Sequence, residues 1–587
     1  ILRRPPGATV LRSMKPPSDS AVIIPIHPLE PHARGTARST PKGRQVAPEA
    51  RERVAVLCEG LAPRADLLIE HLHRLNDAEG ALRRGHLAAL AERLRLSQVE
   101  VYEVASFYHH FQVVEDDAAV PATTVRVCTS LACAMAGGEE LLAYTRQALA
   151  GRSDVAVASA SCIGLCHQAP AACVGQRQLP HASPGDIATR VVRGETTPRA
   201  LPAPAPNGLA QLQRLLAGEL TAEAVIDELK AADLRGLGGA GFPAWRKWQT
   251  VRAQPGERYG IVNIDEGEVG TFKDWQVLTS GAPQVLEGVL IAAHVVGLQQ
   301  VWLYLRDEYH DARVLLEAEL TALLPRLDAL RARYPHYAPP VLELRRGAGA
   351  YICGEESALI ESIEGRRGLP RLKPPIVALH GVFGRPTLAH NLETLWWVPA
   401  LLEQGGAAWA ALGRRGRHGL RRFSVSGRVQ KPGVHLAPAG ITLRELIDEF
   451  AGGMAEGHTL HAFLPGGASG GILPASLADV PLDFDTLAEH GAFVGSMAVV
   501  VLGQHDAARD AALNLMRFFE HESCGQCTPC RAGTGQLVRL MQAPQWDADR
   551  MGELSAVMRE ASICGLGQAA PNPVDSVLRF FPQDVGR

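Results

Sequence analysis

The sequence has few aromatic residues, no excess of charge of either sign and no long uninterrupted apolar run. Phe, Trp and Tyr make up 5% of its 587 residues, too few to indicate a stacking platform for single-stranded nucleic acid. The 59 Lys and Arg nearly balance the 62 Asp and Glu, giving a formal net charge of −3. Nothing therefore favours nucleic acid or an anionic membrane as a partner. The most apolar long stretch, 285–305, is interrupted by Glu287 and His294, so no membrane span is expected.

An export signal is also not recognisable. Arg3 and Arg4 form a twin arginine, but the apolar run that follows, 21–26, is short and contains Pro25. We therefore expect a cytoplasmic protein. The eleven cysteines are an odd number, which argues against a disulfide framework in such a chain. Eight of them fall into two groups of four, and this pattern indicates ligation of a metal ion or of iron–sulfur clusters.

Composition and periodicity divide the chain into segments, and its length suggests three to four domains at roughly 150 residues each. The first segment is rich in proline and lacks any helical or strand period, so we predict a disordered tail there. The predicted segments are the tail at 1–46, a helical leader with a small strand-containing domain at 47–195, a linker at 196–208, an α/β domain with a largely parallel sheet at 209–412, a small α+β module at 423–502 and a helical domain at 506–587.

The first cysteine group consists of two pairs. Cys128 and Cys133 are spaced C-x4-C, and Cys162 and Cys166 are spaced C-x3-C. Each pair follows a predicted strand, so we expect all four thiols on loops at one end of a sheet. Such a set binds zinc or a 2Fe–2S cluster, and zinc knuckles fit these spacings less well. Four unlinked buried cysteines are the remaining alternative.

The second group is Cys524, Cys527 and Cys530 in a C-x2-C-x2-C run, with Cys564 following 34 residues after Cys530. Three closely spaced thiolates and a remote fourth are typical of a 4Fe–4S site, and zinc is the alternative. The other three cysteines are expected to be buried structural residues: Cys58, Cys173 and Cys353.

A glycine-rich stretch at 236–241 contains G-x-G-x-x-G. A dinucleotide-binding fingerprint requires a strand before it, whereas a helix is predicted here, so we reject that fingerprint. Successive glycines still allow backbone N–H groups to approach phosphates; a flexible loop is the alternative. Three further stretches, 263–274, 347–357 and 386–394, place carboxylates and amides beside glycine-rich backbone. They are either solvated acidic faces or sites that recognise ribityl and ribose hydroxyls.

These motifs carry a family resemblance. TVRVCTSLACAMAG and SASCIGLCHQAPA resemble the thioredoxin-like 2Fe–2S subunit of respiratory complex I. Residues 209–575 resemble its NADH-oxidising flavoprotein subunit and homologues in NAD-linked hydrogenases and formate dehydrogenases. The resemblance implies an α/β multidomain fold: a thioredoxin-like 2Fe–2S domain with a helical leader, a Rossmann-like FMN domain, a β-grasp-like module and a C-terminal helical 4Fe–4S domain. It also implies FMN, both clusters and NAD as substrate.

The resemblance assigns residues to these ligands. A carboxylate at Glu356 would accept from ribose hydroxyls and repel a 2′-phosphate, which favours NAD over NADP. Glu268 and Glu356 are the candidate catalytic residues. The expected FMN contacts are Gly236, Gly238, Gly239, Lys247, Asn263, Asp265, Tyr351, Gly354, Glu355, Asn391 and Thr394. The expected nucleotide contacts are Phe242, Glu268, Glu356 and Lys373. The cluster ligands are the eight grouped cysteines.

The sequence departs from this family at a few positions near the expected site. Val269 replaces a proline, Trp245 follows Ala244 where the family has Thr-Gly, Ile376 replaces a phenylalanine and His390 replaces an asparagine. The core motifs are retained.

The expected chemistry links two-electron hydride transfer at NAD to one-electron transfer at the clusters through FMN. No further cysteine or histidine cluster is evident for a second catalytic centre, so the other electron donor or acceptor is expected on another subunit. ESALIESIEGRRGLPR and ESCGQCTPCRAGT resemble the formate dehydrogenase β subunit most closely. Our first hypothesis is NAD⁺ reduction with electrons from formate, oxidised on a large subunit with a molybdenum or tungsten pterin and further clusters. The alternatives are the diaphorase subunit of an NAD-linked hydrogenase, a complex I module and, from another class, a non-catalytic zinc-bound scaffold.

Overall fold

The computed structural model describes residues 43–586, so most of the predicted tail lies outside the described residues. Residues 46–587 form one unit. Its first part is the predicted helical leader, in which Ser97 and Glu100 form a capping box at the start of the last helix. The leader contains α1 (Pro48–Leu57), α2 (Leu68–Glu79), β1 (Leu82–Arg83), α3 (Arg84–Leu94), α4 (Gln98–Phe107) and β2 (Val113–Val114).

The next part is a four-stranded sheet with the strand order β4-β3-β5-β6. Its elements are β3 (Thr123–Cys128), α5 (Leu131–Met135), α6 (Gly138–Leu149), β4 (Val155–Ala160), β5 (Ala172–Val174), β6 (Arg177–Leu179) and α7 (Pro184–Arg193). Strands β3 and β4 are parallel. Both cysteine pairs therefore lie at one end of this sheet, as the sequence predicts.

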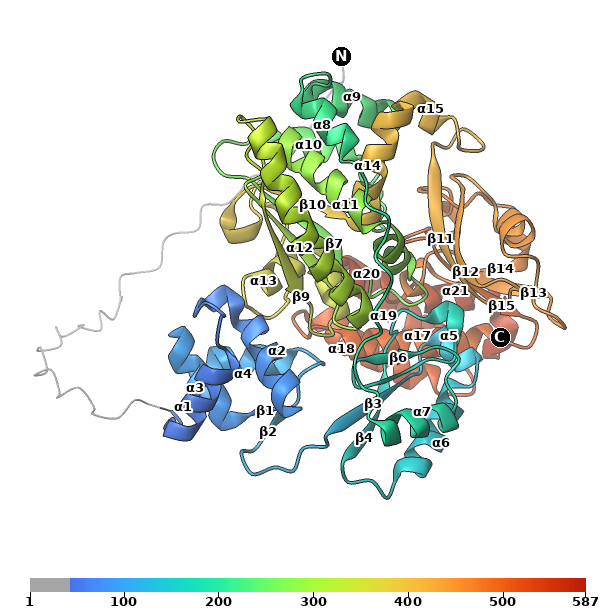
Figure 1. The fold of residues 1–587 in the computed structure, drawn as a ribbon. Helices are drawn as coiled ribbons and strands as arrows, with labels where there is room; N and C mark the ends of the chain where they lie inside the picture. Colours follow the sequence, from blue (N-terminus) through green and yellow to red (C-terminus); the bar gives the residue numbers. More distant parts are fainter. Residues whose placement is uncertain (1–42, 587) are drawn as a thin grey trace, which may run out of the picture. The chain divides into compact units, whose positions relative to one another are not determined.

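A second four-stranded sheet is parallel throughout, in the order β10-β7-β8-β9. Its strands are β7 (Tyr259–Ile264), β8 (Gln300–Leu305), β9 (Val341–Arg346) and β10 (Thr387–Asn391). The associated helices are α8 (Ala210–Leu216), α9 (Ala222–Ala231), α10 (Ala244–Arg252), α11 (Lys273–Val296), α12 (His310–Arg333), α13 (Glu356–Ile363), α14 (Leu392–Gln404) and α15 (Gly406–Ala410). In Figure 1, α12 crosses in front of this sheet. The apolar stretch 285–305 is divided between α11 and β8, and in the described part of the chain no helix is long and apolar enough to cross a bilayer.

The third sheet is mixed and has the order β12-β11-β15-β13-β14. Its strands are β11 (Leu420–Gly427), β12 (Gly433–Pro438), β13 (Leu460–Leu464), β14 (Leu473–Pro474) and β15 (Ala498–Gly503). Strands β11 and β12 form an antiparallel hairpin, and β15 lies parallel to β11. Thr442 and Glu445 form the predicted capping box at the start of α16 (Leu443–Glu445).

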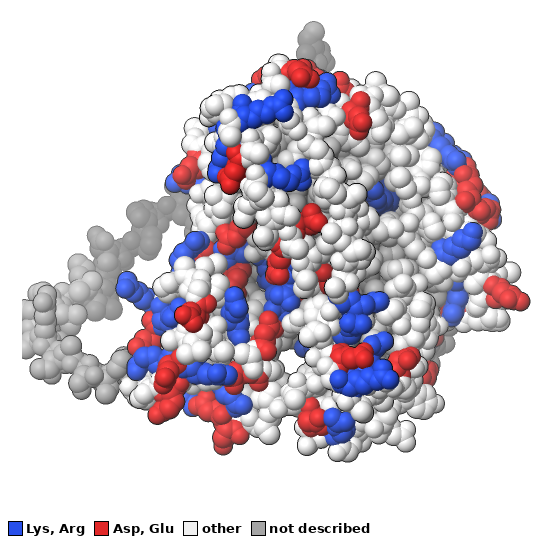
Figure 2. Space-filling model, viewed as in Figure 1, with Lys and Arg blue, Asp and Glu red and all other residues white. Residues whose placement is uncertain are grey.

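The C-terminal part is helical, as predicted, with α17 (Ala508–Glu522), α18 (Thr528–Met541), α19 (Ala548–Ala561), α20 (Gly565–Ala569) and α21 (Asn572–Phe580). Two large apolar clusters join the parts. One combines the parallel-sheet domain with the mixed-sheet module, and the other joins the leader, the C-terminal helices, Cys162 and Cys166. The predicted domain limits cross these shared cores and stay a prediction. On the face shown in Figure 2, acidic and basic side chains are interspersed.

Candidate functional site

Two adjoining cavities lie at the carboxyl end of the parallel sheet, where such sheets usually bind ligands. The first measures about 620 Å³ and the second about 900 Å³. They share the wall residues Gly238, Asn263, Gly354, Glu355 and Asn391. The first cavity is also lined by the mixed-sheet module and by the C-terminal helices. Three parts of the chain therefore form one continuous site.

The glycine-rich loop follows α9, so the predicted helix before it is confirmed. Gly239 has φ +123° and Gly241 has φ +61°, backbone conformations that favour glycine. A Cβ at Gly241 would come within 2.5 Å of the Phe484 ring. The loop can therefore lie this close to the cavity only with glycine at these positions.

The structure brings together the residues that the sequence assigned to FMN and the nucleotide. All line one of the two cavities, with the exception of Thr394. Thr394 is buried, and its hydroxyl accepts a hydrogen bond of 2.9 Å from the Leu237 N–H. It therefore supports the glycine loop from behind.

Asp265 provides a direct test of whether the first cavity fits a polyhydroxylated ligand. Its Oδ2 is buried and has no hydrogen-bond partner in the structure. Burial raises the pKa of Asp265 well above its ordinary value. A buried acceptor without a donor is unfavourable, so a ligand hydroxyl at this wall would satisfy it. Asn263 is held beside it, donating to the Gly354 carbonyl at 2.9 Å.

Glu268 lies on the opposite side of the same loop. It accepts hydrogen bonds from the Tyr351 hydroxyl and, at 2.7 Å, from the Ser469 N–H. Burial raises the pKa of Glu268. Its carboxylate is thus held in one orientation at the cavity wall.

A buried charged network forms the floor of the first cavity. The Lys273 ammonium lies 2.8 Å from Asp274 Oδ1 and 3.0 Å from Glu393 Oε2. Asn391 donates to Asp274 at 2.5 Å. Glu266 accepts from the Asp274 N–H at 2.8 Å, so it caps the start of α11. Opposite charges that are paired and hydrogen-bonded in this way tolerate burial.

The second cavity is more open and carries charge pairs at its wall. Glu356 lies 3.3 Å from the Lys373 ammonium and 3.5 Å from the Lys247 ammonium. Burial would raise the pKa of Glu356, but the two lysines outweigh it and lower the pKa. Phe242 and Ile376 line this cavity, and both are 46% exposed. They form an apolar surface that a ligand can cover.

The positions that depart from the family lie in different surroundings. His390 lines the second cavity and accepts a hydrogen bond of 3.0 Å from Trp248. Burial lowers its pKa to about 3, so the ring is neutral. Val269 is fully buried, and Trp245 packs against the core. Neither residue is among those lining the two cavities.

The four thiols of the first cysteine group are buried. The Sγ atoms of Cys162 and Cys166 are 3.1 Å apart, and Cys128 and Cys133 also lie in hydrogen-bonding contact. Two close pairs match two irons with two thiolates each. The loop is fixed against the acidic loop because Arg306 donates to the Cys162 carbonyl at 2.6 Å and to the Glu266 carbonyl.

The second cysteine group lies at helix starts beside the second cavity. Cys527 is the N-cap of α18, where the helix dipole favours negative charge. Cys530 is buried, whereas Cys524, Cys527 and Cys564 are partly exposed. Cys564 also lines the second cavity. A cluster on these ligands would adjoin the bound nucleotide or flavin.

The spacing of the thiols also bears on the zinc alternative. In the part of the chain that the structure describes, the groups of three or more ligating side chains with atoms mutually within 4.8 Å contain no cysteine. Zn–S bonds of about 2.3 Å would place four sulfurs about 3.8 Å apart around one ion. Both cysteine groups are therefore spaced more widely than a single zinc ion would require.

Comparison with known families gives four matches along the chain. They are "Thioredoxin-like [2Fe-2S] ferredoxin" at residues 56–192, "Nuo51 FMN-binding domain" at 229–400, "SLBB domain" at 422–473 and "NADH-ubiquinone oxidoreductase-F iron-sulfur binding region" at 510–587. The F 2 subunit of the NADH-quinone oxidoreductase of Rhizobium meliloti is 36% identical over 386 residues, which cover 64% of this chain and 90% of that protein. The chain belongs to the family of NADH-quinone oxidoreductase flavoproteins.

Two further relatives place the chain within this family. The mitochondrial NADH dehydrogenase [ubiquinone] flavoprotein 1 of Dictyostelium discoideum is 40% identical over 375 residues, covering 62% of this chain and 78% of that protein. A solved chain of an NAD⁺-reducing [NiFe]-hydrogenase in the H₂-reduced state is 32% identical and superposes with a TM-score of 0.78. The match covers 89% of this chain and 92% of the hydrogenase chain. The hydrogenase chain therefore shares the arrangement of the 2Fe–2S and flavoprotein parts.

The family confirms the predicted fold class and cofactors: FMN, a 2Fe–2S cluster and a 4Fe–4S cluster, with NAD as substrate. The assignment of single residues to these ligands stays a prediction. Some residues of the site have no role predicted from the sequence. Lys273, Asp274 and Glu393 lie within the three acidic stretches, but their pairing depends on packing. Ser469 lies in the glycine run 466–471, for which the sequence favours a turn away from the site.

Proposed function

We propose that this chain binds FMN in the first cavity and NAD(H) in the second, and moves electrons between NAD(H) and its two clusters. The observation that carries this proposal is the shared wall of the cavities, together with the cluster ligand Cys564 at the wall of the second. A bound FMN would supply the exchange of a two-electron hydride for single electrons.

The residues of the chain have distinct roles in this proposal. The glycine loop presents backbone N–H groups toward a phosphate, and Asp265 accepts from a ribityl hydroxyl. Glu268, held by Tyr351 and Ser469, orients the nicotinamide nucleotide. Glu356 accepts from the adenosine ribose and disfavours a 2′-phosphate.

The electron source that we propose is formate, oxidised on a partner subunit with a molybdenum or tungsten pterin and further clusters. The support is the likeness of stretches such as 357–371 and 522–534 to the formate dehydrogenase β subunit. The second candidate is a hydrogenase diaphorase. It is favoured by the match to the NAD⁺-reducing [NiFe]-hydrogenase chain over 89% of this chain.

The deciding experiment is anaerobic co-purification of the complex on a tag on this chain, followed by NAD⁺ reduction with formate or with H₂. We expect NAD⁺ reduction with formate and none with H₂; the same preparation without either donor is the control. Reduction with H₂ alone would replace the formate assignment with the hydrogenase one. NADH oxidation by an artificial acceptor without either activity would sink both assignments, and quinone coupling would then be measured.

A further inference from the structure

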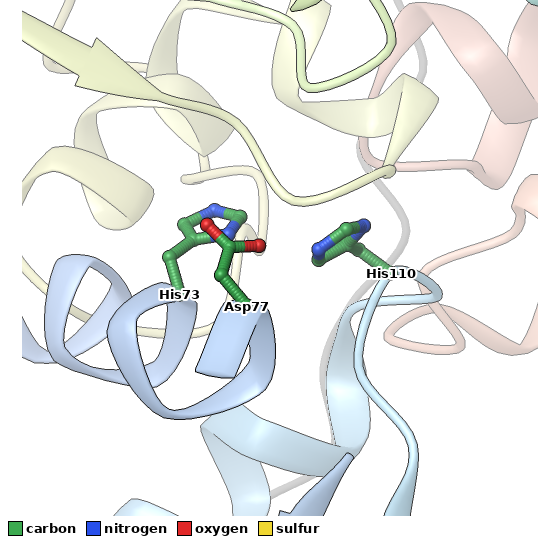
Figure 3. A group of neighbouring side chains, drawn as sticks. All are labelled: His73, Asp77 and His110. Atoms are coloured by element: carbon green, nitrogen blue, oxygen red, sulfur yellow. The ribbon is translucent and has the colours of Figure 1, made fainter. Parts of the chain in front are cut away.

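We propose that His73, Asp77 and His110 bind one divalent transition-metal ion, with Zn²⁺ as the probe, where the helical leader meets the parallel-sheet domain. One ligand atom from each residue lies within 4.8 Å of the other two. Figure 3 shows the Asp77 carboxylate between the two imidazole rings. The site is separate from the eight grouped cysteines and from the two cavities.

His73 has a ring nitrogen that is suited to a metal. Its Nε2 lies 2.9 Å from the Gly347 carbonyl oxygen, which can only accept, so Nε2 carries the hydrogen. Nδ1 then has an open lone pair. This Nδ1 is buried without a hydrogen-bond partner, and the side chain is 3% exposed. An unpaired buried acceptor is rare in proteins, and a bound cation would satisfy it.

His110 is oriented in the same way by a carboxylate. Its Nδ1 lies 2.7 Å from Asp307 Oδ2, so Nδ1 carries the hydrogen and Nε2 has the lone pair. The Asn76 amide lies 3.2 Å from this Nε2. Asn76 is a partly exposed side chain that must turn away when an ion binds. The imidazole itself is already in position.

Asp77 supplies the third ligand and the route of entry. Arg346 donates to both of its oxygens, at 2.6 and 3.3 Å, which leaves a second lone pair on each oxygen. Arg346 also donates to Asp307 at 2.5 Å. Each ligand is thus backed by a hydrogen bond, as metal ligands usually are. The Asp77 side chain is 36% exposed, so an ion can reach it from solvent.

The local charge is compatible with a cation. Asp77 and Asp307 carry two negative charges against one positive charge on Arg346. Arg313 also faces this group, and it lies 4.0 Å from a carboxylate oxygen of its own partner Glu317. Two imidazoles and a carboxylate suit zinc and neighbouring transition metals. Because the ligands lie in the leader and their hydrogen-bond partners lie at the ends of β8 and β9, the ion would tie the leader to the parallel-sheet domain.

A second group, His109, His521 and Glu522, also lies within 4.8 Å, but we assign no ion to it. The two carboxylate oxygens of Glu522 already accept from the Ser161 hydroxyl at 2.8 Å and from the Tyr351 N–H at 3.0 Å.

The test uses the full chain, purified anaerobically with flavin and both clusters and treated with a mild chelator. Zn²⁺ affinity is measured against a chromophoric competitor, and zinc K-edge absorption is recorded at one equivalent. The variants are Asp77→Asn and His110→Gln. His418→Gln is the matched control, because His418 is an exposed histidine 3.4 Å from a carboxylate of Asp233 outside the group.

We expect the wild type and the control to bind one Zn²⁺ through nitrogen and oxygen ligands that include two imidazoles. Both site variants should bind it at least roughly 10-fold more weakly, with unchanged iron and flavin content. Affinity equal to wild type in both variants, sulfur coordination or no stoichiometric binding would overturn the proposal. If neither variant retains its iron and flavin, the wild-type absorption spectrum decides between these results.

Discussion

The two cysteine groups differ in burial and in the part of the flavin site that each adjoins. The thiols of the first group are all buried, and their loop is fixed by Arg306 to the acidic loop 265–268. Three thiols of the second group are partly exposed, and Cys564 forms part of the wall of the second cavity. We infer that the first site is chiefly tied to the stability of the flavin loop, and that the second lies on the path by which electrons enter and leave.

Exchange of Cys564 for serine should have the largest effect. Cys564→Ser removes a ligand at the cavity wall, so electron transfer between NADH and the partner subunit should fall roughly 1,000-fold, about 4 kcal/mol in activation free energy. NADH oxidation by ferricyanide should change little, because flavin is retained.

The matched variant on the buried side is Cys162→Ser. It should lower the thermal midpoint and the flavin content while leaving the 4Fe–4S signal intact. Equal losses of partner reduction in the two variants would remove the functional distinction between the groups.

Asp265→Ala sharpens the comparison on the buried side. Because its Oδ2 has no partner within the protein, removal should weaken FMN binding roughly 10- to 100-fold, the value of a hydrogen bond to a charged acceptor. Flavin fluorescence titration measures this affinity, with Asp233→Ala on the surface as control. Unchanged FMN affinity would show that the ligand does not meet this carboxylate.

Glu356→Gln tests the more open side. Glu356 is partly exposed and paired with Lys247 and Lys373, so its effect should be moderate. The preference for NADH over NADPH, as the ratio of kcat/KM values, should fall roughly 10-fold at unchanged flavin content. A preference that stays constant would place the adenosine ribose elsewhere.

Glu266→Gln should have the smallest effect, on the pH dependence of stability. Burial and the nearby Asp274 raise the pKa of Glu266 to about 8, above an unfolded value of about 4.3. Between these pH values the folded chain holds more protons than the unfolded chain, so stability falls as pH rises. The variant should lose roughly 2–4 °C less in Tm than wild type between pH 5 and pH 8, as calorimetry would show. A loss equal to that of wild type would mean that Glu266 is ionised throughout.

Much of this arrangement follows from local patterns in the sequence. The paired cysteines after β3 and β4, the helix before the glycine loop and the capping box at Thr442 depend on short-range rules, and the structure confirms them. Strand β10 was not predicted, because 387–391 has no strand period and forms only by pairing with β7. The Lys273–Asp274–Glu393 network and the contact of Ser469 with Glu268 join residues that lie far apart in the chain. Such contacts depend on tertiary packing, which spacing rules do not contain.

The most direct test of the central claim is an anaerobic measurement of iron, zinc and flavin content, combined with electron paramagnetic resonance before and after addition of NADH. The account predicts one FMN and six irons per chain, two for the 2Fe–2S site and four for the 4Fe–4S site, with cluster signals that appear when NADH is added. A protein that carries zinc on its grouped cysteines, or that binds flavin but shows no cluster reduction by NADH, would contradict it.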